Sequence, residues 1–218
     1  MKAVILAAGR GKRMGSLTDE RPKPLLKFKD KELIKHTLDL IPRAASEIII
    51  IVGYYGDLIR AAVGAMWNDI PVVYIDEPDL KGTGYALWKA RERLAGETFL
   101  VFPADDIYAA TDVAALIAAG SSILAAHVAS GTVSGGKVVT GSAGEIISIT
   151  EGTHVAPAHV NAAVYHLDHR FFDYPLVLIP GRTEYGLPQT LALYAKDVPV
   201  RIVEASAWKQ VVGPDDLK

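Results

Sequence analysis

The sequence predicts an α/β fold in which a mostly parallel, mixed sheet carries helices on both faces. Short runs of branched apolar residues recur along the first half of the chain, and a stretch with apolar residues at helical spacing follows each run. Strands that alternate with helices form parallel sheets, and the ligand crevice of such folds lies beyond the carboxyl ends of the strands. We therefore expect the functional site at that edge of the sheet.

The first half of the chain supplies the strands and helices of this pattern. Buried parallel strands are predicted at residues 3–7, 47–52, 71–75 and 98–102. The apolar residues that mark the intervening helices are Ile34, Leu38 and Ile41, then Leu58, Ile59, Ala62 and Met66, and then Ala86, Leu87, Ala90 and Leu94.

The second half changes character. Glycine-rich stretches flank residues 137–139, and a polar–apolar run at 145–150 follows, so a small hairpin added to the sheet is predicted here. No internal repeat or low-complexity linker is visible, and we expect one domain over residues 1–218. The remaining predicted elements are a strand at 159–167, a helix at about 187–195 and a last strand at 200–204.

Composition excludes several classes of protein. A chain of 218 residues that is 50% hydrophobic can bury a full core. A net charge of -2 predicts no general attraction to nucleic acid or to anionic membranes. The absence of cysteine excludes disulfides, a thiolate nucleophile and zinc–thiolate sites. No apolar run is long enough for a signal sequence or a membrane span, so a cytoplasmic protein is expected.

A glycine-rich loop with a local excess of cations follows the first predicted strand. Gly9 and Gly11 allow left-handed backbone and close approach to a ligand, so that consecutive N–H groups can point at phosphate oxygens. This combination predicts a site for a polyphosphate. The charged residues between positions 9 and 29 are Arg10, Lys12, Arg13, Arg21, Lys23, Lys27 and Lys29, against Asp19 and Glu20.

Two common phosphate-binding patterns do not fit this loop. A dinucleotide fingerprint needs a third glycine where Met14 stands, and a Walker loop needs a closing Gly-Lys-Ser/Thr. Arg13 and Lys23 instead suit the neutralisation of charge that builds on a phosphorus centre and its leaving group. Pro22 and Pro24 restrict the backbone beside Lys23 and would help to aim its ammonium group.

Acidic residues follow two further predicted strands at the same edge of the sheet. Asp105 and Asp106 come after one strand, where a carboxylate is well placed to hold Mg²⁺, although Asp106 could instead cap the next helix. Glu77 follows another strand, and Gly82 and Gly84 would let a base lie against bare backbone. An ionised Glu77 only accepts hydrogen bonds and would favour the N–H groups of guanine or cytosine, unless it is merely an exposed loop carboxylate.

Six segments match one known pattern in the expected order. They are residues 6–14, 21–26, 81–87, 103–106, 161–165 and 208–217. Together they resemble the motifs of the sugar-1-phosphate nucleotidyltransferases, the nucleoside-diphosphate-sugar pyrophosphorylases of the NTP-transferase superfamily. The resemblance implies a three-layer, Rossmann-like nucleotidyltransferase fold without the C-terminal β-helix domain of some relatives. It also implies Mg²⁺-assisted transfer of a nucleotidyl group from an NTP to a sugar-1-phosphate, with release of pyrophosphate.

The resemblance also implies roles for individual residues. Arg13, Lys23 and Asp105 would be catalytic, and Asp105 with Gln210 would hold the metal. The implied nucleotide-binding residues are Leu6, Ala7, Ala8, Gly9, Gly11, Arg13, Glu77, Gly82 and Thr83. The implied acceptor-side residues are Lys23, Gly136, Glu151, Asn161 and Glu184.

Three positions depart from the family pattern. Gln210 stands where a second metal-binding aspartate is expected, and its amide brings no charge. Gly152 replaces a lysine that grips sugar and phosphate. Lys137 follows Gly136 where the family commonly has an apolar residue, and from the neighbouring strand it could supply the missing cation.

Alternatives remain open at this point. Residues 84–91 also resemble inositol-phosphate cytidylyltransferases, so a polyol- or choline-phosphate acceptor is one alternative. A glycosyltransferase of related architecture would leave Arg13 and Lys23 unexplained. A non-catalytic sugar-nucleotide-binding protein would explain Gln210 and Gly152 as lost chemistry. A homo-oligomer is compatible with each of these alternatives.

Overall fold

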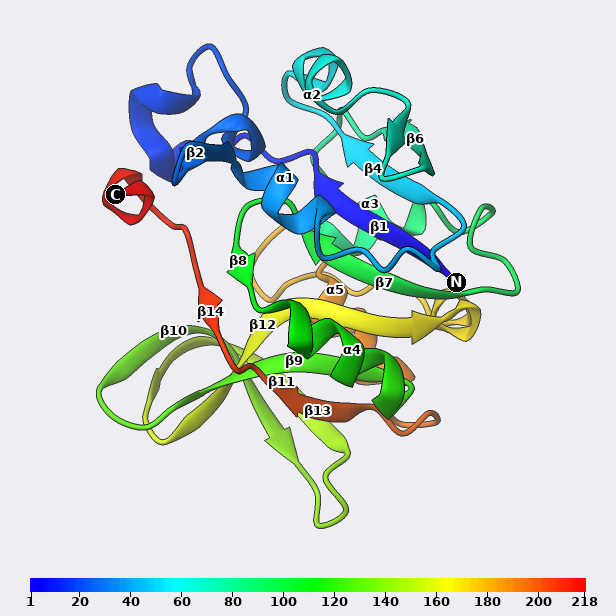
Figure 1. The fold of residues 1–218 in the computed structure, drawn as a ribbon. Helices are drawn as coiled ribbons and strands as arrows, with labels where there is room; N and C mark the ends of the chain where they lie inside the picture. Colours follow the sequence, from blue (N-terminus) through cyan, green and yellow to red (C-terminus); the bar gives the residue numbers. More distant parts are fainter.

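Four parallel strands form the centre of a ten-stranded mixed sheet (Figure 1). A computed structural model describes residues 1–218. The parallel strands, in spatial order, are β7 (Thr98–Pro103), β1 (Lys2–Ala7), β4 (Ile48–Val52) and β6 (Ile70–Asp76). They lie where the sequence predicts buried strands, and this part of the prediction is confirmed. Their carboxyl ends share one edge of the sheet.

Antiparallel strands extend the sheet beyond β7. The long strand β12 (Ala158–Asp168) pairs with β7 and carries both the hairpin and a second short branch of the sheet. The hairpin lies where it is predicted, but its strands are longer than expected. The added strands are β10 (Thr132–Thr140) and β11 (Ile146–Val155) of the hairpin, and β9 (Ser122–Val128) and β13 (Arg201–Glu204) of the branch.

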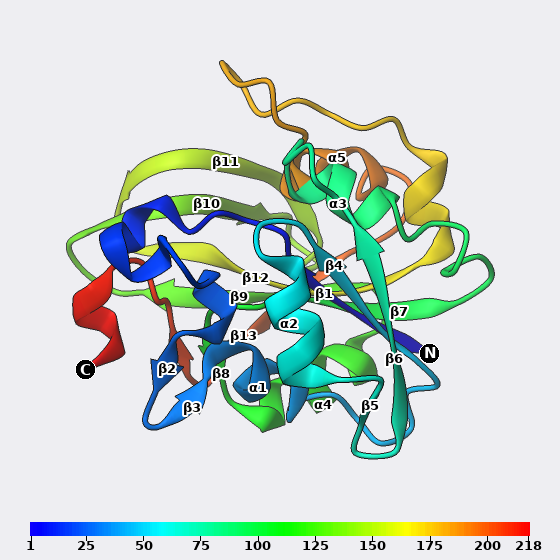
Figure 2. The same cartoon turned by 90° about the horizontal axis from the view of Figure 1, so that it is seen from above.

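Helices cover both faces of the sheet, as predicted (Figure 2). One face packs against α1 (Leu33–Leu38), α2 (Gly56–Val63) and α4 (Ala110–Ala119). The other packs against α3 (Thr83–Trp88) and α5 (Leu187–Tyr194). Side chains of β4 alternate between these two cores, because successive residues of a strand point to opposite faces.

Several details differ from the sequence prediction. Ile41 lies beyond the end of α1, and Ala90 and Leu94 lie in turns beyond the end of α3. Met66 does not continue a helix, because α2 ends at Val63 and the next residue, Gly64, has a φ of 79° that turns the chain toward the short strand β5 (Met66–Trp67). Neither α4 nor β9 is anticipated by the sequence pattern. α4 is alanine-rich, without a polar face or a side-chain cap, so it lacks the signals that mark a surface helix.

The basic segment packs against the end of the chain. It forms two 3-10 helices, η1 (Lys12–Thr18) and η2 (Lys23–Leu25), and a small ribbon of β2 (Lys27–Phe28) and β3 (Lys31–Glu32). Residues 208–217 run back to it through β14 (Trp208–Lys209), which pairs with β8 (Ile107–Tyr108), and end in η4 (Pro214–Leu217). Both views place this end beside η1 (Figures 1 and 2). The apolar residues they share are Met14, Leu26, Phe28, Leu33 and Val211.

The helices of the protein are short. None of them is both long and apolar enough to cross a membrane.

Candidate functional site

A cavity of about 820 Å³ lies at the carboxyl ends of β1, β6 and β7. Its lining divides into two walls. The lining residues of the glycine-loop wall fall within 6–12, 23–24, 77–86 and 103–105. The lining residues of the hairpin wall fall within 135–136, 151, 161–165 and 179–189, and Gln210 of the C-terminal segment completes the cavity.

The structure brings most of the predicted site residues together at this cavity. Arg13 instead lines an adjoining hollow of about 230 Å³, which shares Gly11, Lys12, Lys23 and Asp105 with the main cavity. Lys137 lines neither of them. The predicted residues that line the main cavity are Leu6, Ala7, Ala8, Gly9, Gly11, Lys23, Glu77, Gly82, Thr83, Asp105, Gly136, Glu151, Asn161, Glu184 and Gln210.

The two glycines of the loop have different roles. Gly11 adopts a left-handed φ of 63°, and a Cβ there would lie 2.8 Å from the Cβ of Lys23. Gly9 has no positive φ, and a Cβ built on it meets nothing within 4 Å. The expectation of left-handed backbone is therefore right for Gly11 and wrong for Gly9. Gly11 lets the lysine side chain pack tightly against the loop.

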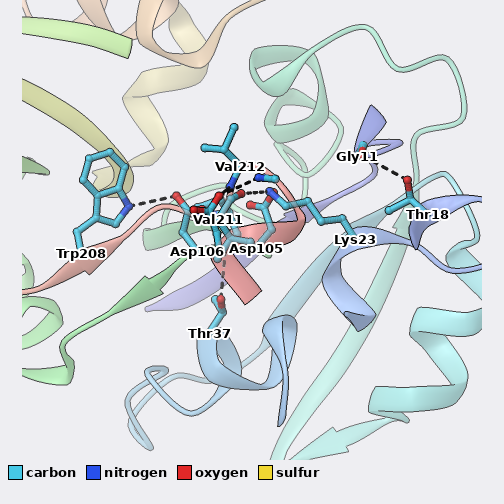
Figure 3. A network of polar contacts seen from close by, with 12 residues as sticks. Gly11, Thr18, Lys23, Thr37, Asp105, Asp106, Trp208, Val211 and Val212 are labelled. Atoms are coloured by element: carbon cyan, nitrogen blue, oxygen red, sulfur yellow. Dashed lines mark hydrogen bonds and ion pairs between the residues drawn. The ribbon is translucent and has the colours of Figure 1, made fainter. Parts of the chain in front are cut away.

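Lys23 and Asp105 form an ion pair between the main cavity and the adjoining hollow (Figure 3). The Nζ atom of Lys23 lies 2.6 Å from Oδ2 of Asp105, and it also donates to the carbonyl oxygen of Val211. The lysine side chain is only 8% exposed, whereas the aspartate is 33% exposed. The ammonium group is thus held at a fixed place, while the carboxylate still reaches the cavity.

Asp106 points away from its neighbour and fastens the C-terminal segment (Figure 3). Its Oδ1 accepts from the backbone N–H of Val211 at 3.0 Å, and its Oδ2 accepts from Nε1 of Trp208 at 3.1 Å. Burial, and then the nearby charge of Asp105, raise the pKa of Asp106 to about 6. Asp106 does not cap the next helix, because Ala109 is the residue at the start of α4. Because Asp106 holds Trp208 and Val211, on either side of Gln210, it positions Gln210 at the cavity.

Asp105 and Gln210 fit a Mg²⁺ ion by the chemistry of their oxygens. Both line the cavity. Mg²⁺ is commonly held through one or two carboxylates together with substrate phosphates and water, and one carboxylate with one amide oxygen matches that pattern. No group of three or more His, Cys, Asp or Glu side chains in the protein is arranged to hold a metal ion. A cation at this place would therefore share its coordination with a bound phosphate.

A distortion in β12 shapes the hairpin wall. The register between β12 and β9 shifts between Asn161 and Tyr165, and Ala163 inside this bulge has a φ of 61°. Nδ2 of Asn161 donates to the hydroxyl of Tyr165 at 2.7 Å, and its Oδ1 accepts from the backbone N–H of Ala163 at 2.9 Å. Burial raises the pKa of Tyr165 well above its usual value. The bulge thus turns a polar pair into the cavity.

Gly136 belongs to the same wall and pairs with Glu151 across the hairpin. A Cβ on Gly136 would lie 2.9 Å from Cγ2 of Ile149 and 3.1 Å from Oε1 of Glu151. The glycine therefore leaves room for the glutamate carboxylate beside the cavity.

The sequence predicts that Gly82 and Gly84, in the turn before α3, leave bare backbone for a base. The structure shows that other backbone lies against both glycines. A Cβ on Gly82 would clash with the carbonyl oxygen of Tyr185, and one on Gly84 would lie 3.0 Å from Gly186. The backbone N–H of Gly84 donates to the carbonyl of Tyr185 at 2.9 Å, and the hydroxyl of Thr83 accepts from the N–H of Leu187 at 3.1 Å. These glycines are thus needed for the approach of the 185–187 backbone, although Gly82 also lines the cavity.

Sequence reasoning missed several lining residues of the hairpin wall. Arg182 is its one lysine or arginine, and Tyr165 and Gln189 add polar groups. Arg182 lies on an exposed loop with no motif of its own. Tyr165 lies within a segment that the sequence did single out, but its direction depends on the bulge. Nothing in the sequence around Gln189 marks it as part of a site.

A cavity lined by a glycine-rich loop and several cations at the ends of parallel strands is typical of α/β domains that bind nucleotides. The family model of the MobA-like NTP transferase domain matches residues 3–201. The chain belongs to this family of nucleotidyltransferases.

Individual relatives agree with this assignment. The chain is 26% identical over 221 residues to the bifunctional protein GlmU of Methanococcus aeolicus, covering 100% of this chain and 53% of that protein. It is 26% identical over 233 residues to the UTP–glucose-1-phosphate uridylyltransferase AglF of Haloferax volcanii, covering 99% of this chain and 93% of the relative. The chain spans about half the length of the GlmU relative.

A solved structure shows the same fold. It is a candidate glucose-1-phosphate thymidylyltransferase of Bacillus anthracis in complex with sucrose. It matches with a TM-score of 0.85 and 21% identity over 100% of this chain and 92% of its own. This likeness confirms the predicted nucleotidyltransferase fold.

Proposed function

We propose that residues 1–218 form one catalytic domain that transfers a nucleotidyl group from an NTP to a sugar-1-phosphate and releases pyrophosphate. The observation that carries the proposal is the Lys23–Asp105 pair, held where the main cavity meets the adjoining hollow. At this place a fixed cation and a carboxylate would lie close to a phosphorus atom that exchanges one oxygen substituent for another. The incoming oxygen would approach from one cavity and the leaving oxygen would depart into the other. The names of the AglF and B. anthracis relatives, which specify glucose-1-phosphate, support a sugar phosphate as the acceptor.

The glycine-loop wall would bind the triphosphate. Backbone N–H groups between Leu6 and Gly11 would donate to phosphate oxygens, as in other anion-binding loops. Arg13 and Lys12 line the adjoining hollow and would neutralise the pyrophosphate that leaves. Lys23 would neutralise the charge on the transferring group, from a position that its bond to Val211 already fixes.

The reaction needs no covalent enzyme intermediate. A phosphate oxygen of the acceptor would form a bond to the α-phosphorus while the bond from that phosphorus to the bridging oxygen of pyrophosphate breaks. Positioning and charge neutralisation supply most of the catalysis in such transfers. A Mg²⁺ ion, when bound by Asp105 and Gln210, would add charge neutralisation at the phosphates. Glu151, Asn161 and Glu184 on the hairpin wall would contact the acceptor hydroxyls.

The test is a matrix of NTPs against sugar-, polyol- and choline-phosphates with detection of released pyrophosphate. Release with a sugar-1-phosphate, and formation of the matching NDP-sugar, is the expected result. Release of pyrophosphate only with a polyol- or choline-phosphate would show that the acceptor is of that class and not a sugar-1-phosphate. Nucleotide binding without release across the whole matrix would contradict the proposal and favour a non-catalytic sugar-nucleotide-binding protein.

A further inference from the structure

Glu77 is a buried acid on the wall of the cavity. The residue is 2% exposed, directly follows β6, and lines the cavity beside Leu80 and Gly82. It forms no ion pair, since the nearby ammonium of Lys81 pairs with Asp79 at 3.0 Å. The carboxylate accepts one hydrogen bond, a long one of 3.5 Å from the backbone N–H of Lys81. Such a length makes a weak hydrogen bond.

The backbone of Glu77 is held firmly. Its N–H donates to the carbonyl oxygen of Val52 at 2.8 Å, which continues the pairing of β6 with β4. Its own carbonyl lies so close to Gly53 that a Cβ there would be 2.6 Å away. The carboxylate is therefore presented from a fixed strand end and not from a mobile loop.

A carboxylate on a cavity wall with so few protein donors can take donors from a ligand. An ionised carboxylate has two acceptor oxygens and no donor. Neither oxygen of Glu77 is cut off from the cavity without a partner, so the oxygen that has no protein donor is open to a ligand there. The cavity in front of Glu77 is where a ligand would supply them. The partner that suits two neighbouring acceptors is a pair of N–H groups side by side.

Among the nucleobases, guanine alone offers that pair. Its ring N–H and its exocyclic amino group are adjacent. Uracil and thymine have one N–H between two carbonyl oxygens, which a second carboxylate oxygen would repel. Cytosine and adenine have an amino group beside a ring nitrogen lone pair, and the same repulsion applies.

We propose that Glu77 selects guanine, so that the NTP of the proposed reaction is GTP. This inference rests on the proposed function in assuming that the cavity takes a nucleotide with its base at Glu77. The backbone N–H of Gly82 has no hydrogen-bond partner within the protein and is a donor available for the guanine carbonyl. Two acceptors and one neighbouring donor complement the guanine edge.

The test compares nucleotides on the unmodified protein by isothermal titration without acceptor. We expect GTP to bind about 10- to 100-fold more tightly than UTP, TTP, CTP or ATP, the range of discrimination given by a good bidentate pair. Inosine triphosphate lacks only the exocyclic amino group and should bind about tenfold more weakly than GTP. This arm needs no variant and does not depend on whether a substitution folds.

The matched variants are Glu77→Gln and Asp79→Asn. Both replace a carboxylate by an amide just after β6, but Asp79 is exposed and lies outside the cavity. Glu77→Gln presents a donor beside an acceptor, so we expect the GTP-to-UTP affinity ratio to fall at least tenfold. Asp79→Asn should leave that ratio unchanged.

Failure of this inference and failure of the proposed function give different results. Pyrophosphate release with UTP or TTP in preference to GTP would overturn the guanine assignment and leave the proposed reaction standing. A wild-type preference for GTP that Glu77→Gln leaves unchanged would also overturn the role of Glu77. GTP-selective binding that Glu77→Gln abolishes, without release for any acceptor, would support the inference and contradict the proposed reaction.

Discussion

The glycine-loop wall and the hairpin wall of the cavity are built in different ways. The glycine-loop wall is rich in glycine and alanine and lies at the ends of β1, β6 and β7. β1 and β6 both pair with β4, which is buried at every residue. The hairpin wall is made of side chains from long antiparallel strands, one of them bulged, and from the loop before α5. Lysine and arginine also divide unequally, with Arg10, Lys12 and Lys23 on the first wall and Arg182 on the second.

This difference suggests that the two walls bind different parts of the ligands. Short loops that are held at the ends of a parallel sheet have a fixed position, and they suit the part of the ligand that every reaction of this type shares. Side chains on a hairpin and a loop are easily exchanged, and they suit the part that varies. On the proposed function, substitutions on the first wall should affect the chemical step, whereas those on the second should affect acceptor affinity.

The largest effect is expected at Lys23. Lys23→Ala removes a buried cation that contacts Asp105 and Val211, and kcat/KM should fall by roughly 100- to 1,000-fold, the loss typical when one preorganised charge donor is deleted. Lys27→Ala is the matched control, since Lys27 is an exposed lysine of the same segment outside the cavity. Initial rates of pyrophosphate release measure both. A loss below tenfold in a folded Lys23→Ala variant would mean that the ion pair is structural.

An intermediate effect is expected at Gln210, which joins the two walls. Gln210→Asp adds a negative charge to the cavity that Asp105 also lines, and the Mg²⁺ concentration for half-maximal activity should fall by on the order of tenfold, because ligand charge is one factor that tunes cation affinity. Mn²⁺ binding to the nucleotide-free variant, followed by electron paramagnetic resonance, gives a second measurement.

Gln210→Asn controls for the change in side-chain length, because it keeps an amide oxygen. An unchanged metal requirement in the aspartate variant would remove Gln210 from the proposed metal site.

The smallest effect is expected on the hairpin wall. Arg182→Ala should raise the acceptor KM about fivefold with little change in kcat, since an exposed cation is screened by water and salt. Lys137→Ala should leave the acceptor KM unchanged, because Lys137 lines neither space. Steady-state kinetics at low and high salt measure both. A higher KM for Lys137→Ala, with no effect of Arg182→Ala, would reverse the assignment of the acceptor cation.

The sequence predicts the glycine-loop wall better than the hairpin wall for a physical reason. Loop residues after a buried strand lie at a known edge of a parallel sheet, so Gly9, Glu77 and Asp105 could be placed together from their position alone. The side chains of the hairpin wall depend on non-local pairing. Arg182, for example, lies on a loop whose 185–187 end packs on the distant turn before α3.

The fold itself was predicted where patterns are strong. The isoleucine-rich β4 is unmistakable, because its side chains are buried on both faces. The sequence pattern does not predict α4 or β9, because both contain several alanines and alanine contributes little to a hydrophobic periodicity. The alternation of side chains along a strand already argues against Lys137 as a cavity residue. It directly follows Gly136, and successive side chains of a strand point to opposite faces.

The contacts of residues 208–217 with Lys23 and Asp106 also bear on the order in which parts of the site form during synthesis. Every strand of the large sheet has left the ribosome once Glu204 has emerged. The ammonium of Lys23 still lacks its carbonyl partner on Val211, and the carboxylate of Asp106 still lacks both of its donors. The sheet can therefore form during synthesis, but Lys23 and Asp106 gain these partners only when residues 208–211 pack against the segment that holds η1 and η2 (Figure 1).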